Sequence, residues 1–229
     1  MMSACQIGGG IEPSVTTLVL PYEAKIASCT TYSFEDNANS NIILGEARGD
    51  MLLVGFAPGL SREAQERVLA QYPFFDRLDG EVALESGNIT KVLLHPDATC
   101  FEAEKMLKML QKQDEVVFAT PAFHPKPSEA DAYQWVGLSN EILVSVESPE
   151  ALEQLEHWMK KTKSTLVLSL SDELHLISAD KNSKGNALEL SSSLNQLAFV
   201  AAAEPNLIYS LTPINGQDAE VQSVRSKLP

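Results

Sequence analysis

One pattern occurs twice along this chain, and this repeat constrains the fold more than any other feature. Each copy predicts a strand, a helix, two strands, a second helix and a last strand. The first copy opens with the strand 51–56 and closes with 116–121, while the second opens with 141–146 and closes with 199–206. A repeat of roughly 85–90 residues is too long for a solenoid unit and suits two small domains in tandem.

Capping residues and apolar spacing locate the helices. Ser61 and Ser148 each precede a helical pattern, where a hydroxyl can accept a hydrogen bond from a free backbone N–H. Pro149 follows at a position where its missing N–H costs nothing. In the second helix of each copy, apolar residues recur at helical spacing. These residues are Phe101, Ala103, Met106, Leu107 and Leu110 in the first copy, and Ala187, Leu188, Leu190, Leu194 and Leu197 in the second.

The repeated order predicts an α+β fold of two tandem ferredoxin-like (βαββαβ) plaits, each an antiparallel four-stranded sheet with two helices on one face. The predicted parts are a flexible leader with room for one edge strand (1–48), plait 1 (49–124), a linker (125–139), plait 2 (140–212) and a mobile tail (213–229). The linker has too few apolar residues for a shared core, so the plaits are expected to fold separately. The uncovered sheet face of each plait is expected to bind a partner or to pack on the other plait.

The charge of the chain restricts its partners. Seventeen basic and 31 acidic residues give a net charge of −14, which argues against nucleic-acid and anionic-membrane binding because both need basic patches. This net charge is compatible with a basic protein partner. A high net negative charge more often serves to keep a protein soluble. No apolar run approaches the roughly 18 residues that a membrane-spanning helix needs, so no transmembrane segment is predicted.

The three cysteines leave several readings open. Cys5, Cys29 and Cys100 show no CxxC spacing and no metal-type cluster. Cys100 begins an apolar helical pattern and is expected to be a buried thiol. A disulfide between Cys5 and Cys29 is an alternative in an oxidising compartment. The first residues also look like the tail of a bacterial lipoprotein signal. Cys5 is therefore a candidate lipidation site, although the charged and apolar regions of such a signal are missing.

Residue patterns of known catalytic sites are absent from the sequence. There is no GxSxG elbow, Walker loop, GxGxxG or HExxH motif, and the four histidines are scattered. His175 alternates with apolar residues and is expected on a polar or partner-facing surface. We therefore assign no catalytic, metal or cofactor-binding residue and expect a protein that is not an enzyme.

Three segments resemble the prodomains of subtilisin-like serine proteases. Residues 56–61 (Phe-Ala-Pro-Gly-Leu-Ser) resemble the turn from the first prodomain strand into its helix, and residues 184–189 resemble the second helix of bacterial, particularly Bacteroidetes-type, members. Residues 203–206 (Ala-Glu-Pro-Asn) look like the signature that closes the last strand. The likeness covers roughly 49–124 and 139–210. The first copy departs from the pattern, since Ala-Thr-Pro-Ala stands at 119–122.

The resemblance implies a non-catalytic protein that chaperones or inhibits a subtilisin-like serine protease, in cis or in trans. The sheet would dock on the enzyme, and the tail would lie in the substrate cleft as an added strand. The implied partner-binding residues are Glu204, Pro205, Asn206, Leu207, Ile208, Tyr209 and Leu211. The implied location is extracellular or in the cell envelope, with a lipid anchor at Cys5 as an option and the cytoplasm left open.

Two alternatives remain from the sequence. Residues 207–211 can instead finish an edge strand of their own domain, which would make the chain a scaffold or interaction module for a partner or for a non-protease C-terminal domain. A small-ligand sensor ranks below both, because the sequence shows no convergent polar cluster. RNA binding ranks last, because the charge has the wrong sign.

Overall fold

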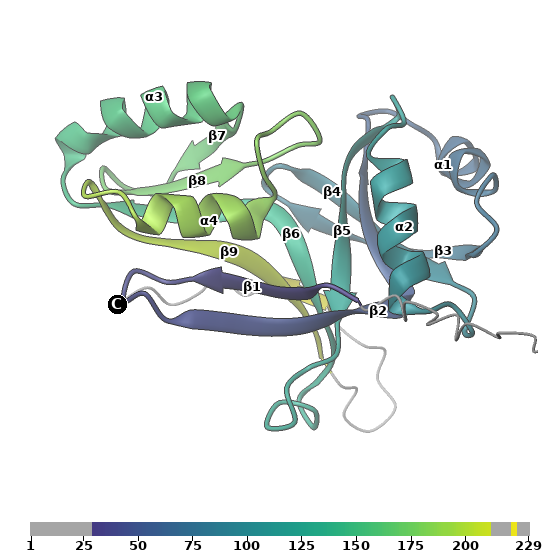
Figure 1. Cartoon of the computed structure of the whole chain (residues 1–229). Helices are drawn as coiled ribbons and strands as arrows, with labels where there is room; N and C mark the ends of the chain where they lie inside the picture. Colours follow the sequence, from purple (N-terminus) through teal and green to yellow (C-terminus); the bar gives the residue numbers. More distant parts are fainter. Residues whose placement is uncertain (1–28, 212–220, 224–229) are drawn as a thin grey trace, which may run out of the picture.

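The computed structural model of the chain describes residues 29–211 and 221–223 (Figure 1). The N-terminal half contains β1 (Thr31–Glu35), β2 (Asn41–Phe56), α1 (Arg62–Leu69), β3 (Phe75–Leu84), β4 (Gly87–Leu94), α2 (Cys100–Leu110) and β5 (Val116–Phe123). The C-terminal half contains β6 (Tyr133–Val146), a 3-10 turn (Pro149–Ala151), α3 (Leu152–Thr162), β7 (Thr165–Ser169), β8 (Leu174–Ser178), α4 (Ala187–Asn195), β9 (Val200–Leu211) and β10 (Val221–Ser223).

The helices begin where side chains can cap them. The hydroxyl of Ser61 accepts a hydrogen bond from the N–H of Ala64, which confirms the expected start of α1. Capping boxes begin the other two capped helices, formed by Thr99 with Glu102 in α2 and by Asn186 with Glu189 in α4. The predicted capping role of Ser148 is wrong. This residue precedes the 3-10 turn, and its side chain makes no capping hydrogen bond.

The described strands form one antiparallel sheet, so the predicted fold class of two separate ferredoxin-like plaits is wrong. The strand order is β10-β9-β6-β5-β2-β4-β3, with β1 added to β2, and with β8 and then β7 added to β6. The halves are joined where β5 pairs with β6, at Ala122 with Gly137 and at Phe123 with Val136. Although the order of elements along each half follows the repeat, no boundary separates two independent four-stranded sheets.

Two strands are longer than the sequence pattern indicated, and this extra length causes the difference. β2 begins at residue 41, inside the predicted leader, and β6 begins at 133, inside the predicted linker. The early part of β2 pairs with β1 and forms an arm beside α4 and β9 (Figure 1). The backbone of Glu35 at the end of this arm is hydrogen-bonded to the side chains of Ser192 and Asn195, at 2.9 and 2.8 Å.

The apolar core is shared between the halves. One cluster lies under α1 and α2, and another lies under α3 and α4 and includes Phe34 of β1. A third cluster crosses the junction, where Trp135 and Ile208 of the C-terminal half pack with Leu53 and Phe118 of the N-terminal half. The expectation that the linker lacks residues for a shared core is therefore wrong, since Trp135 belongs to that segment and is 5% exposed.

A close approach at Gly137 brings β6 onto β2. A Cβ atom added there would collide with Cδ1 of Leu53, so a larger residue would force the buried side chain of Leu53 to move. This contact lies beside Trp135, at the centre of the cluster that the halves share.

A disulfide joins Cys29 to Cys100, whose Cα atoms are 5.9 Å apart. The expected buried thiol at Cys100 and the Cys5–Cys29 alternative are both wrong, and Cys5 lies outside the described residues. The bridge fixes the segment before β1 to the first residue of α2. Thr30 strengthens this attachment, because its N–H and hydroxyl donate to the carboxylate of Glu104 at 2.7 and 3.0 Å.

Among the described residues no helix combines the length and apolar character needed to cross a membrane.

Candidate functional site

The residues predicted to enter a protease cleft lie in β9 and pair with β6 of the same chain. Along this ladder Glu204 is opposite Leu143, and Leu211 is opposite Tyr133. On its other side β9 pairs with β10, a strand inside the predicted tail 213–229. Residues 208–210 therefore already have strand partners on both sides.

Several side chains of this segment are buried inside the molecule. Ile208 is fully buried in the cluster at the junction, and Pro205 is also buried. The amide of Asn206 donates to Oε2 of Glu141 at 2.8 Å. Leu207 and Leu211 keep partial exposure. These positions favour the alternative in which residues 207–211 finish a strand of their own sheet.

Tyr209 is held by a second aromatic ring. Its centroid lies 4.7 Å from that of Tyr133, on the paired strand. Burial, and to a lesser degree the charge of Glu129, raises the pKa of Tyr209, so the phenol stays protonated at neutral pH.

A buried polar network connects the β3–β4 turn to β6. Glu141 is 1% exposed, and its Oε1 accepts a hydrogen bond from the N–H of Ser86 at 2.7 Å. The hydroxyl of Ser86 donates to Oδ1 of Asn140 at 3.1 Å, and Nδ2 of Asn140 donates to the carbonyl of Ala179 at 3.1 Å. A buried carboxylate needs such partners, so the network joins the halves rather than forming an open site.

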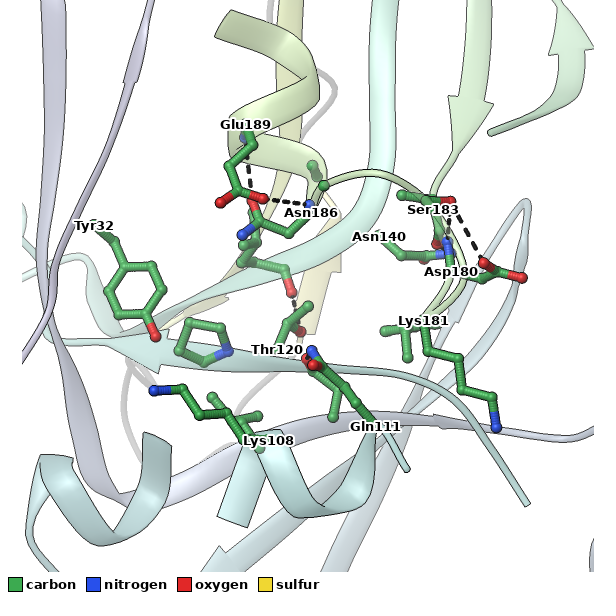
Figure 2. Close-up of a pocket in the computed structure, with 18 of the residues that line it drawn as sticks. Tyr32, Lys108, Gln111, Thr120, Asn140, Asp180, Lys181, Ser183, Asn186 and Glu189 are labelled. Atoms are coloured by element: carbon green, nitrogen blue, oxygen red, sulfur yellow. Dashed lines mark hydrogen bonds between the residues drawn. The ribbon is translucent and has the colours of Figure 1, made fainter. Parts of the chain in front are cut away.

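A cavity of about 330 Å³ lies on the helical side of the junction (Figure 2). Its walls come from β1, α2, β5 and β6, from the loop between β8 and α4, and from the start of α4. Figure 2 shows Tyr32 and Lys108 on one side and Asp180 and Lys181 on the other, with Thr120 between them.

Most polar groups of this cavity bond to the protein itself. The hydroxyl of Thr120 donates to the carbonyl of Leu138 at 2.6 Å, and Glu189 accepts from the N–H of Asn186 at 2.9 Å. Burial, followed by the charges of Glu104 and Glu189, raises the pKa of Tyr32 to about 12. This phenol therefore stays protonated at neutral pH and is unsuited to act as a base there.

Strand β7 forms a free edge of the sheet, since it pairs with β8 and with no other described strand. Its sequence Thr-Leu-Val-Leu-Ser carries no charge, and Leu166 and the following Leu170 are 36% and 39% exposed. The register shifts between Leu166 and Leu168, so one bulge interrupts the ladder.

The edge strand β3 provides a contrast within the same sheet. It carries the charged residues Asp76, Arg77, Asp79 and Glu81, and it has a register shift around Gly80, whose φ is +78°. Charges and bulges on an edge prevent pairing with another chain. β7 has the bulge but lacks the charges.

Three basic side chains lie next to the start of β7 in this acidic protein. The last turn of α3 contains Lys160 and Lys161, and Lys163 follows in the left-handed conformation with φ 59°. A groove of about 400 Å³ lies beside the strand, and its lining residues include Glu156, Met159, Lys160, Lys163 and Leu166. None of the three lysines forms an ion pair with another described residue.

His175 is buried, so its expected surface position is wrong. It is 1% exposed and lies opposite Val144 of β6. Its Nδ1 is 2.9 Å from the hydroxyl of Ser169 on β7, while Nε2 has no well-aligned hydrogen-bond partner among the described residues. Burial lowers the pKa of His175, and the nearby backbone and carboxylate of Asp172 oppose this effect.

The sequence carries a signal for this edge that is not a catalytic motif. The uncharged run 165–170 follows three lysines within four residues, in a chain of net charge −14.

No protein-family model matches this chain, and no solved structure matches it. The resemblance to subtilisin-like prodomains therefore rests on the sequence segments alone.

Proposed function

We propose that this chain is a non-catalytic interaction module that binds an extended, acidic segment of a partner protein along β7. The observation that carries this proposal is the uncharged free edge of β7, with its exposed leucines beside an unpaired cluster of lysines in the described structure.

Strand addition explains how such an edge binds. The outer side of an edge strand presents backbone N–H and C=O groups that an added strand can pair with, and pockets for alternate side chains give specificity. Leu166 and the groove beside it offer an apolar contact for one face of the added strand. The bulge at Val167 and the five-residue length of β7 restrict pairing to a short segment.

The lysines determine the charge of the partner. Lys160, Lys161 and Lys163 lie at the end of α3, next to the start of β7, and they favour carboxylates on the incoming segment. Exposed ion pairs contribute only about 0–1 kcal/mol each. We therefore expect them to guide orientation and association rate more than affinity.

The test uses a defined probe. A fluorescent peptide of alternating valine and glutamate is titrated with the full chain, and a valine–lysine peptide serves as its charge-reversed counterpart. We expect the acidic peptide to bind more tightly and to associate faster than the basic one. Leu166→Lys, which puts a charge on the edge as β3 does, should weaken binding at least tenfold, or about 1.4 kcal/mol.

Met109→Lys is the matched control, because Met109 of α2 is 41% exposed and lies outside the proposed edge. Equal weakening by both substitutions, or equal binding of both peptides, would contradict the proposal. The prodomain alternative is tested in parallel by residual activity of several subtilisins. Inhibition that Leu166→Lys leaves unchanged would replace the β7 proposal with that alternative.

A further inference from the structure

Two sulfur atoms and one carboxylate meet where the segment before β1 crosses the start of α2. They belong to Cys29, Cys100 and Glu46 of β2, and one ligand atom from each lies within 4.8 Å of the others. The cysteines are 71 positions apart, so their spacing in the sequence gave no indication of this cluster. The two sulfurs form a disulfide in this structure.

An imidazole lines the groove beside this cluster. Glu46, Cys100 and His124 line one groove, and His124 is exposed. The strand register explains this position, because Ala47 of β2 is paired with Phe123 of β5. In an antiparallel pair the residue before Ala47 and the residue after Phe123 are then opposite each other.

We propose that reduction converts the Cys29–Cys100 disulfide into a Zn²⁺ site whose ligands are Cys29, Cys100 and Glu46, with the fourth ligand supplied by His124 of the same groove once its side chain turns toward the sulfurs. A dithiol reductant supplies two electrons and two protons, the S–S bond breaks, and the reductant becomes a disulfide. Zn²⁺ then replaces the two thiol protons, which leave to water.

The geometry suits this ion. Zn–S bonds of about 2.3 Å place two sulfurs of a tetrahedral site about 3.8 Å apart, so the two sulfurs, which are bonded here, need to separate only slightly once the disulfide is reduced. Thiolate ligands also select zinc over hard cations such as magnesium or calcium.

The local charges also favour a bound divalent cation. Cys100 is the first residue of α2, where backbone N–H groups favour a thiolate. Two thiolates beside the carboxylate of Glu46 would repel one another, and a divalent cation removes that repulsion. Both forms of the site keep the segment at Cys29 attached to α2. The chain would then hold this attachment under oxidising and under reducing conditions.

The experiment uses Co²⁺ as a spectroscopic substitute for Zn²⁺. The full chain is reduced anaerobically with a phosphine and titrated with Co²⁺, and the oxidised chain is titrated in parallel. We expect one Co²⁺ per reduced chain, with a sulfur-to-cobalt charge-transfer band and tetrahedral d–d bands, and neither band in the oxidised chain. Stoichiometric Zn²⁺ should displace the cobalt.

Variants identify the ligands. Glu46→Gln should weaken Co²⁺ binding at least tenfold and Cys100→Ser should lower the charge-transfer band to half or less, because only one thiolate is left, whereas Cys5→Ser and the exposed α3 control Glu153→Gln should change neither. Because Cys100→Ser also removes the disulfide, a second measurement uses the native sequence: Zn²⁺ should slow alkylation of Cys29 and Cys100 in the reduced chain at least tenfold. Unchanged alkylation, binding by the oxidised chain, or a site lost in Cys5→Ser would overturn the proposal.

Discussion

At the scale of single residues, His175 makes the stability of the fold depend on pH. Its imidazole lies in the β7–β8 hairpin with its Nδ1 beside Ser169, and burial lowers its pKa. The folded chain therefore keeps the neutral ring, while the unfolded chain takes up a proton below the ordinary histidine pKa of about 6.5. The stabilisation is complete above that pH and is lost as the pH falls.

We expect the free energy of unfolding to decrease between pH 7.5 and 5.5, partly through His175. Linkage to one proton limits this contribution to about 1.4 kcal/mol per pH unit. Urea denaturation at both pH values should show a smaller decrease in His175→Gln. His157→Gln, at an exposed histidine of α3, should behave like the native sequence. Identical pH dependence in His175→Gln would mean that this imidazole takes up its proton equally in the folded and the unfolded chain.

At the scale of elements, local chemistry was readable from the sequence and long-range pairing was not. Ser61 and the apolar spacing from Phe101 to Leu110 correctly located α1 and α2. The early part of β2 was missed although Ile42, Ile43 and Leu44 form an apolar run, because the mostly polar and glycine positions 45–50 separate that run from the predicted strand 51–56. The limit on long-range pairing applies to the disulfide, because only the fold brings Cys29 to Cys100. The uncharged run of β7 was visible, but its edge position needed the sheet order.

β9 provides the test of whether residues 207–211 belong to the sheet. Ile208 is fully buried, whereas Leu211 is partly exposed on the same strand. Ile208→Asp should lower the free energy of unfolding by about 3 kcal/mol or more, because it removes a core side chain and buries a charge. Leu211→Asp should cost about 1 kcal/mol or less.

The measurement is the urea midpoint of both variants at one pH. Equal and small effects would show that the end of β9 is not packed in the core in solution. In that case the segment would be free to act as the cleft-binding tail that the sequence resemblance implies.

At the scale of the whole molecule, the repeat indicated two units but could not show how they join. Several features connect the halves, among them the β5–β6 pairing, the Ser86–Glu141 network, the cluster around Trp135 and the arm of β1 against α4. All but the β5–β6 pairing join positions far apart in the sequence, and two of the residues, Ser86 and Trp135, lie in segments that looked like a turn and a linker. A polar composition over 125–139 therefore concealed the strand that closes the junction.

These connections predict one cooperative unfolding transition instead of two. The two tryptophans make this measurable, since Trp135 lies at the junction and Trp158 packs against the C-terminal core. In Trp158→Phe the fluorescence reports the junction, and in Trp135→Phe it reports the C-terminal half. We expect both fluorescence transitions to coincide with the far-ultraviolet circular dichroism of the whole chain, as a two-state protein requires. If the junction signal changes at a lower urea concentration than the other two, the halves separate before they unfold, and the shared cluster contributes less than the cores on either side.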